Sequence, residues 1–246
     1  MPDLWSIERG PGGAFARCAA LQVDGVTHAF GLRGHDAGKA GSAESLARLA
    51  ACAPGPQRML RQVHRAAIVR GCEIRAGGVE ADGAWDRLED LSRGFLAVVT
   101  ADCVPILLAS RDGRFVAALH AGWRGTAQRI AARAVDVLRE QGCPPEGLLA
   151  AIGPSIGPCC YPVSEHVAAA VARASGVAVK GEAGPTGLDL RGANREQLLA
   201  AGVAAESVHA APWCTACETE LFFSYRRDGV AAGRQLSLIG PIGGRP

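Results

Sequence analysis

The chain has 246 residues, of which 48% are hydrophobic, and its 26 Lys and Arg nearly balance its 24 Asp and Glu, for a net charge of +2. A chain of this length can bury a sizeable core without disulfides, and so balanced a charge creates no long-range field that gathers nucleic acid or anionic lipid. We therefore expect neither a nucleic-acid-binding nor a membrane-binding protein.

The cysteine content and the start of the chain bear on where the protein works. Nine cysteines is an odd number in a chain that is not short, which favours reduced thiols over a secreted disulfide framework. The segment Met1 to Trp5 has no basic region followed by an apolar run. The most apolar stretch, Phe95 to Ala109, is too short to span a bilayer. The sequence therefore predicts a soluble cytoplasmic protein.

The first predicted elements are short. A helix is expected to begin at Ser42 and to stop before the run Pro54-Gly55-Pro56. A strand is predicted from Arg61 to Arg70, and a glycine-rich loop that includes Gly83 is expected after it.

The middle of the chain has the clearest pattern. The segments Phe95 to Thr100, Val104 to Ala109 and Phe115 to Leu119 are predicted strands. Between the last two, Asp112-Gly113 is a strong hairpin signal. A helix is expected after Gly122, ending at Gly142, with apolar residues spaced by four, three and four at Ala127, Ala131, Ala134 and Leu138.

The last third mixes both kinds of element. We predict a strand at Ala150 to Ile152, a rigid loop at Gly153 to Pro158, helices at Ser164 to Gly176 and Ala193 to Gly202, and a hairpin from Leu221 to Ile239 turned at Arg227-Asp228-Gly229. Because strands and helices alternate irregularly, the sequence predicts an α/β (α+β) fold, a single domain over residues 1–246 with mixed β-sheets flanked by helices.

Three residues at predicted strand ends are candidate metal ligands. His64 lies near the start of a strand, Cys103 precedes another, and His120 follows a third. A thiolate and two imidazoles suit zinc, and three protein ligands leave the fourth position of a catalytic zinc open. The spacings of 39 and 17 residues match no compact zinc signature, so ordinary buried His and Cys remain the alternative.

Several short motifs occur in an order that is specific in combination. They are Gln62-Val63-His64, Ala81-Asp82-Gly83, Thr100-Ala101-Asp102-Cys103-Val104-Pro105, His120-Ala121-Gly122-Trp123-Arg124-Gly125, Ile152 to Tyr161, Leu188-Asp189-Leu190, Phe222 to Gly229 and Gly233-Arg234-Gln235. In these motifs the sequence resembles the YfiH-like, or laccase-domain, family, whose members are described as polyphenol oxidases and as purine nucleoside phosphorylases.

The sequence departs from the family pattern in two places. Phe30 to His35 stands where the family has a Phe-Ser-Thr-Arg stretch followed by Gly-Gly, and of that stretch Arg33 is kept. Pro162 replaces the usual Glu after Cys-Cys-Tyr. The first departure puts substrate preference in doubt.

The resemblance implies a zinc site at His64, Cys103 and His120, with copper as a possible occupant of the same ligands. It also implies phosphorolysis of adenosine, inosine and methylthioadenosine-like nucleosides, with adenosine deamination as a second activity. The expected partners are a small-molecule nucleoside and phosphate, and the expected assembly is a monomer or small homo-oligomer.

Candidate roles follow for other residues. Deamination needs a carboxylate that carries a proton, and the motifs offer Asp82 and Asp102. Asp102 could equally orient a ligating histidine. Phosphorolysis needs cations that hold phosphate against the ribose, for which Arg33, Arg61 and Arg124 are candidates.

The other cysteines and the aromatic residues are interpreted mainly as structural. Cys159 and Cys160 are expected to be small buried thiols, and Cys214 and Cys217 form a lone C-x-x-C, which is weak support for a zinc or redox site. The aromatic run Phe222 to Tyr225 is expected to supply core and turn residues.

Competing functions use the same residues. Without a metal, Cys103 could be a catalytic nucleophile activated by His120, as in an amidase or peptidase that edits cell-wall precursors. A copper-dependent polyphenol oxidoreductase is a further alternative, although six His in the chain are few for several copper ions. The metal could also be purely structural in an interaction protein.

Overall fold

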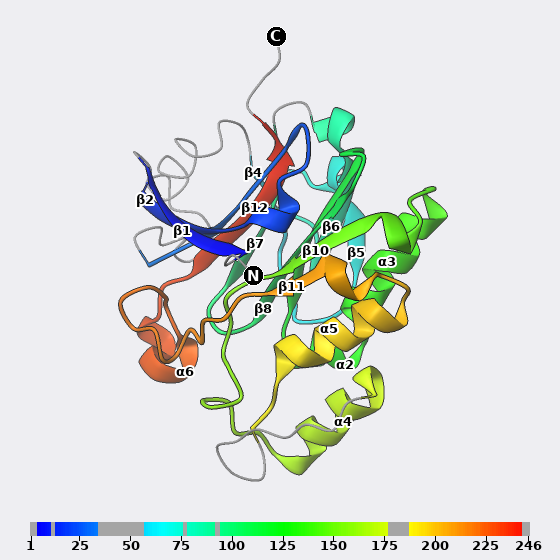
Figure 1. Ribbon diagram of the computed structural model, residues 1–246. Helices are drawn as coiled ribbons and strands as arrows, with labels where there is room; N and C mark the ends of the chain where they lie inside the picture. Colours follow the sequence, from blue (N-terminus) through cyan, green and yellow to red (C-terminus); the bar gives the residue numbers. More distant parts are fainter. Residues whose placement is uncertain are drawn as a thin grey trace.

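The computed structural model describes residues 4–10, 13–33, 57–75, 78–91, 94–176 and 187–242. In this part of the chain the strands form two six-stranded sheets (Figure 1). The first has the order β1-β2-β3-β12-β7-β4, with strands Trp5–Gly10, Gly13–Cys18, Val26–Gly31, Gln235–Pro241, Phe95–Thr100 and Gln57–Met59. The second has the order β11-β10-β8-β9-β6-β5, with strands Val208–Ala210, Leu148–Ile152, Val104–Ser110, Phe115–Ala121, Gly83–Arg87 and Ile68–Arg70.

The α-helices are fewer than the strands. They are α2 (Trp123–Ala127), α3 (Ile130–Glu140), α4 (Glu165–Ser175), α5 (Leu190–Ala200) and α6 (Tyr225–Asp228). Short 3-10 helices occupy Ala19–Leu21, Gly71–Glu73, Leu88–Leu91, Pro145–Gly147, Ala205–Ser207 and Gly229–Ala231. In Figure 1 the helices α2, α3 and α5 lie beside the second sheet, on the side away from the first sheet.

Strands β8 and β9 lie in the middle of three layers and are buried along their whole length. Along β8, Leu107 and Ala109 belong to the core between the two sheets, whereas Ile106 and Leu108 belong to the core beneath the helices. A strand covered on both faces has to be apolar at consecutive positions. This arrangement confirms the predicted mixed sheets flanked by helices.

The prediction is confirmed most closely for β7, β8 and β9. The hairpin at Asp112-Gly113 joins β8 and β9 antiparallel. The helix expected after Gly122 is present but broken, because Arg129 has the left-handed φ of 63° and separates α2 from α3. Helix α5 begins at Leu190, earlier than predicted, because the Asp189 side chain accepts a hydrogen bond from the Gly192 N–H at 2.9 Å.

Three other predictions are corrected or untested. The strand expected over 61–70 is limited to β5, since His64 has a φ of 57° that no regular strand accommodates, and Gly83 begins β6 instead of lying in a loop. The hairpin expected over 221–239 is wrong, because Ser224 accepts a hydrogen bond from the Arg227 N–H and begins α6. The helix expected at Ser42 lies outside the described residues.

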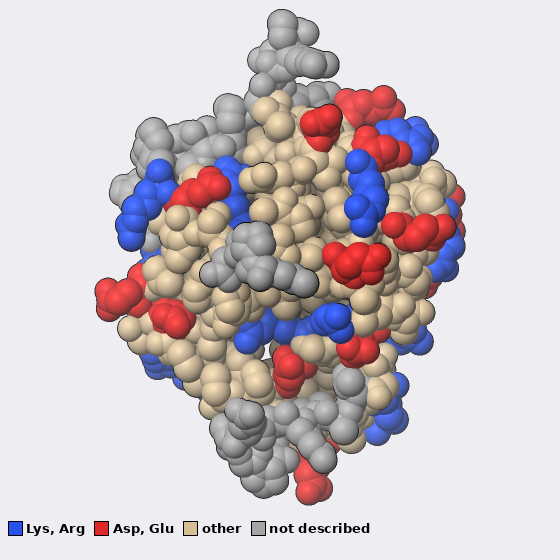
Figure 2. All heavy atoms as spheres, in the orientation of Figure 1, with Lys and Arg blue, Asp and Glu red and all other residues tan. Residues whose placement is uncertain are grey.

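The described surface mixes charges of both signs. Figure 2 shows Lys and Arg interspersed with Asp and Glu on one face, as the near-zero net charge predicts. Among the described residues, no helix is long and apolar enough to cross a membrane.

Candidate functional site

The sheet register brings Cys103, His120 and Asp82 to one end of the second sheet. In the antiparallel pairing of β8 with β9, Val104 lies opposite Ala121, so Cys103 and His120 lie at the same end, as the predicted hairpin requires. On the other side of β9, the residue after Asp82 pairs with Leu119, and the His120 N–H donates to the Asp82 carbonyl at 2.7 Å.

The buried Asp82 carboxylate joins His120 to the segment that carries His64. Its Oδ1 accepts from the His64 N–H at 2.8 Å and lies 2.8 Å from His120 Nδ1, and its Oδ2 accepts from the Arg65 N–H at 2.7 Å. Burial raises the pKa of Asp82, but the hydrogen bonds from His120, Arg65 and His64 outweigh it, so the pKa is lowered. These bonds hold His64 in its left-handed conformation and leave His120 Nε2 as the nitrogen free for a metal.

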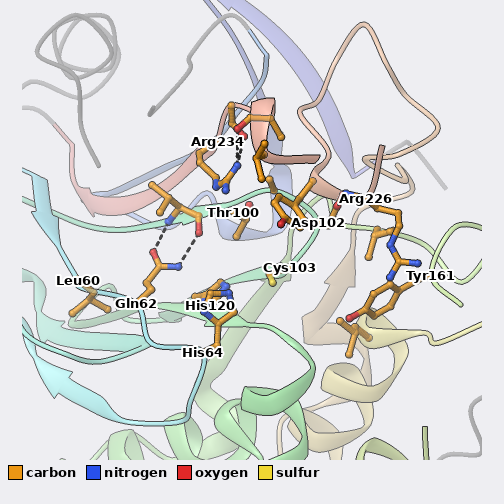
Figure 3. Close-up of a pocket in the computed structure, with 18 of the residues that line it drawn as sticks. Leu60, Gln62, His64, Thr100, Asp102, Cys103, His120, Tyr161, Arg226 and Arg234 are labelled. Atoms are coloured by element: carbon orange, nitrogen blue, oxygen red, sulfur yellow. Dashed lines mark hydrogen bonds between the residues drawn. The ribbon is translucent and has the colours of Figure 1, made fainter. Parts of the chain in front are cut away.

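His64, Cys103 and His120 converge (Figure 3), and their ligand atoms all lie within 4.8 Å of one another. The two imidazole rings are perpendicular, with centroids 4.7 Å apart. Gly122 makes room for them, since a Cβ there would lie 3.1 Å from Cys103 Sγ and 3.5 Å from His64 Cδ2. The trio forms a compact set of one soft and two borderline donors, which could hold a single zinc or copper ion.

The charges within the trio favour a thiolate. Burial raises the pKa of Cys103, but His120 and His64 outweigh it through charge and hydrogen bonds and lower the pKa to about 6. Burial lowers the pKa of His120, whereas the Cys103 thiolate and Asp82 raise it to about 9. Near neutral pH the chain without metal therefore holds Cys103 as a thiolate, the form that binds metals or attacks electrophiles.

Asp102 lies beside Cys103 and is held differently from Asp82. Its φ of 88° is strained for a residue with a side chain. Its Oδ1 accepts from the Thr215 hydroxyl at 2.7 Å and its Oδ2 from the Arg226 N–H at 2.7 Å. It is 8% exposed and lines the cavity above Cys103, whereas Asp82 is fully buried and lies outside the lining. In this structure the residue that orients a histidine of the trio is Asp82 rather than Asp102.

The trio lies in the wall of a cavity of about 1050 Å³. Apolar side chains, Leu60, Ile156 and Leu190 among them, supply part of the lining. The phenol of Tyr161 also lines the cavity; burial and the nearby Cys103 charge raise its pKa to about 12, so it stays protonated. A space of this size, mostly apolar with a few polar groups, is typical of a small-molecule site.

The three arginines chosen from the sequence are not all at this cavity. Arg61 lines it while pairing with Glu80 at 3.2 Å. Arg124 lines an adjoining hollow of about 630 Å³, and His64 lines both spaces. Arg33 is not among the residues that line either space, and it donates to the Thr219 carbonyl at 2.7 Å.

Sequence reasoning missed the basic residues on the opposite wall. Arg226 and Arg234 line the cavity (Figure 3). Tyr225 is a further residue of the lining. Arg226 lies over the ring of Tyr161, with its guanidinium carbon 5.0 Å from the ring centroid. Both arginines belong to motifs noted in the sequence. The hairpin expected over residues 221–239 gave no reason to predict that they lie near His64.

The cysteines outside the trio also differ from expectation. Cys159 is exposed and Cys160 half-buried, whereas both were expected to be buried. Cys214 is buried and Cys217 exposed.

Comparisons with known proteins show the family and the fold. A family model described as multi-copper polyphenol oxidoreductase laccase matches residues 30–241. The crystal structure of YlmD from Geobacillus stearothermophilus superposes with a TM-score of 0.85 and 31% identity, covering 98% of this chain and 99% of that chain.

Two curated relatives have names that state an activity. A purine nucleoside phosphorylase, YlmD of Geobacillus stearothermophilus, is 42% identical over 151 residues, which are 59% of this chain and 55% of that protein. The match therefore spans about half the length of this relative. An adenosine deaminase, RL5, from an unknown prokaryotic organism, is 38% identical over 192 residues, which are 74% of this chain and 73% of that protein.

Proposed function

The chain belongs to the family described as multi-copper polyphenol oxidoreductase laccase, and on this premise we propose that it is a zinc-dependent enzyme of purine nucleosides. Its main reaction is the phosphorolysis of adenosine, inosine or related nucleosides, and adenosine deamination is a second activity. Both activities are named among its relatives. The observation that carries the proposal is the convergence of His64, Cys103 and His120 in the wall of a cavity that Arg226 and Arg234 also line.

The donor set suits zinc. A thiolate with a lowered pKa and two imidazoles, one of them oriented by Asp82, match the ligands and the hydrogen-bonded supports of catalytic zinc sites. When bound, zinc supplies Lewis-acid polarisation at this point of the cavity wall. The cavity lining includes two imidazoles among the described residues, which favours one ion over a group of copper ions.

The cationic residues of the opposite wall are suited to phosphate. In phosphorolysis, phosphate displaces the base from C1′ of the ribose, so an anion must be held against the sugar. Arg226 and Arg234 line the cavity, and their Nη1 atoms also donate to backbone carbonyls, of Pro162 for Arg226 and of Ala232 and Gly233 for Arg234. Guanidinium groups bind phosphate oxygens strongly. The protonated Tyr161 phenol can donate a hydrogen bond to the substrate.

Proton transfer belongs to Asp102 in this proposal. Asp102 lines the cavity next to Cys103 in the chain, whereas the described contacts of the Asp82 carboxylate are with His120 and residues 63–65. In the deaminase reaction a carboxylate has to carry a proton between the attacking water and the leaving amine. Asp102 is the acidic residue in the described lining of the cavity.

One observation favours a second candidate function. Cys103, His120 and Asp82 lie in the order thiol, imidazole and carboxylate, and the thiol pKa is about 6. The same order activates a cysteine nucleophile in amidases and peptidases.

The deciding experiment measures phosphate-dependent release of hypoxanthine or adenine from inosine and adenosine. We expect base release by the wild type and the Cys72→Ala control, and its loss in Cys103→Ala. In Asp102→Asn, with zinc retained, we expect loss of the conversion of adenosine to inosine. If neither nucleoside is cleaved although zinc is bound, the proposal fails. Rapid labelling of Cys103 by iodoacetamide before any chelation would then favour the thiol hydrolase.

A further inference from the structure

The fold brings together two cysteine pairs that lie far apart in the sequence. Strands β10 and β11 run parallel, with Ile152 opposite Ala210, so the loops after them leave the same end of the sheet. The first loop carries Cys159 and Cys160, and the second carries Cys214 and Cys217. Hydrogen bonds continue between the loops: the Ala211 N–H donates to the Ile152 carbonyl at 2.8 Å and the Thr215 N–H to the Ser155 carbonyl at 3.1 Å.

The spacing of the four sulfurs fits one tetrahedral metal ion. All four Sγ atoms lie within 4.8 Å of one another. Cys217 Sγ lies 3.4 Å from Cys160 Sγ and 3.7 Å from Cys159 Sγ. Zinc–sulfur bonds of about 2.3 Å at tetrahedral angles put sulfurs about 3.8 Å apart, whereas a disulfide needs about 2.05 Å. An iron–sulfur cluster, in which the cysteines ligate different irons, would hold them farther apart.

Gly157 lies directly against the cluster. Its N–H donates to Cys214 Sγ, 3.1 Å away. A side chain at Gly157 would crowd the site, because its Cβ would lie 3.2 Å from Cys159 Sγ and 3.3 Å from Cys214 Cβ.

Two arginines hold the cysteine loop and bring positive charge near it. Arg227 Nη1 donates to the Thr215 carbonyl at 3.1 Å and to the Ala216 carbonyl at 3.2 Å. Arg191 Nη1 donates to the Trp213 carbonyl at 2.8 Å, next to Cys214. Four thiolates with one divalent cation carry a charge of −2, which the Gly157 N–H and the Arg191 guanidinium partly offset, whereas Arg227 is paired with Asp228.

We propose that Cys159, Cys160, Cys214 and Cys217 bind one zinc ion in a second, structural metal site. The four thiols lose their protons to solvent and form four zinc–sulfur bonds as thiolates, with no change in oxidation state. Because all four positions are taken by protein ligands, the site has no place for substrate. The assignment is independent of the reaction proposed above.

This site anchors one wall of the cavity. Tyr161 follows Cys160 directly and lines the cavity. Thr215, between the two cysteines of the C-x-x-C pair, donates its hydroxyl to Asp102 Oδ1 at 2.7 Å. A zinc ion at this site would fix both loops and so hold Asp102 beside Cys103.

The test counts metal ions in the whole protein purified under reducing conditions. We expect two zinc ions per chain in the wild type and in the Cys72→Ser control, and one in the Cys214→Ser/Cys217→Ser variant. The Cys103→Ala variant, which lacks a ligand of the other site, should retain one. Cobalt in that variant should give the absorption spectrum of a four-thiolate tetrahedral site, which a His–Cys–His site cannot give.

The proposal has an outcome that overturns it even if a cysteine variant does not fold. Titration of wild-type thiols with a mercurial reagent should release two zinc ions per chain. If the Cys103→Ala variant holds no metal, if its ion is iron, or if peptide mapping without reductant finds these four cysteines in disulfides, the zinc assignment is wrong. Failure of nucleoside cleavage leaves these measurements unaffected.

Discussion

At the scale of single residues, backbone strain marks the candidate site. Among the described residues, His64, Asp102 and Arg129 are the non-glycine residues with positive φ, and two of them belong to the site. Such conformations persist where the surroundings impose them, as the three N–H bonds to Asp82 do around His64. His64 was identified from the sequence as a ligand, but its conformation depends on a carboxylate eighteen residues away.

A test at this scale is the substitution Asp82→Asn. Asparagine keeps the size of the side chain but removes the charge and one of the acceptor oxygens that hold His120 and Arg65. We expect zinc affinity, measured by competition with a chelator, to fall about 10- to 100-fold. The control Asp136→Asn changes an exposed carboxylate on α3 and should leave the affinity unchanged. Equal affinities in the two variants would show that Asp82 does not orient the metal ligand.

At the scale of elements, the predictions that were confirmed are mainly those for strands that are buried in the fold. Strands β7, β8 and β9 are covered by other layers, so their continuous apolar runs are visible in the sequence. The segments 61–67 and 222–234 were predicted to form β-structure, yet they form walls of the cavity as a loop and as the short helices Tyr225–Asp228 and Gly229–Ala231. Local periodicity cannot distinguish them, because their conformation is set by long-range contacts such as those of Asp82 and Asp102.

Strand β3 carries a pH-dependent part of the stability. Burial and then the charge of Arg17 lower the pKa of His28 from 6.5 to about 4, and its Nε2 accepts from the Cys18 N–H at 3.0 Å. On acidification, His28 therefore binds a proton at a higher pH in the unfolded chain than in the folded chain. The contribution of His28 to the free energy of unfolding is fully present above about pH 6.5. It is lost as the pH falls through about 4, by up to about 3 kcal/mol.

Urea unfolding at about pH 7 and about pH 4 measures this contribution. We expect His28→Gln, which keeps a hydrogen-bond acceptor and does not titrate, to lose less stability between these pH values than the wild type. A wild type and variant with the same acid dependence would contradict the assignment to His28.

At the scale of the whole molecule, the cavity is assembled from segments that no local pattern connects. Its lining comes from the segments 59–64, 99–103 and 225–234, and from His120, Ile156, Tyr161 and Leu190. The two sheets supply different parts of this wall, so the site requires both sheets to be folded and packed.

The arginines of this wall can be tested directly. We expect Arg226→Met and Arg234→Met each to raise the KM for phosphate about tenfold to a hundredfold, since a charged hydrogen bond contributes about 1.5–3 kcal/mol. Zinc content should not change. Arg114→Met, at an exposed position on the β8–β9 hairpin, is the matched control. An unchanged KM in both cavity variants would exclude these arginines as the phosphate site.

The sequence by itself determined the central strands and the β8–β9 hairpin, and it predicted His64, Cys103 and His120 as candidate metal ligands. These depend on local signals: continuous apolar runs, a turn dipeptide and motifs at strand ends. Only the tertiary structure decided that Asp82 orients His120 while Asp102 faces the cavity, and that Arg226 and Arg234 complete the wall. It also decided that two cysteine pairs meet across the loops after β10 and β11. Each of these depends on which strand ends lie side by side, and that is set by the packing of two sheets over a shared core rather than by neighbours in the chain.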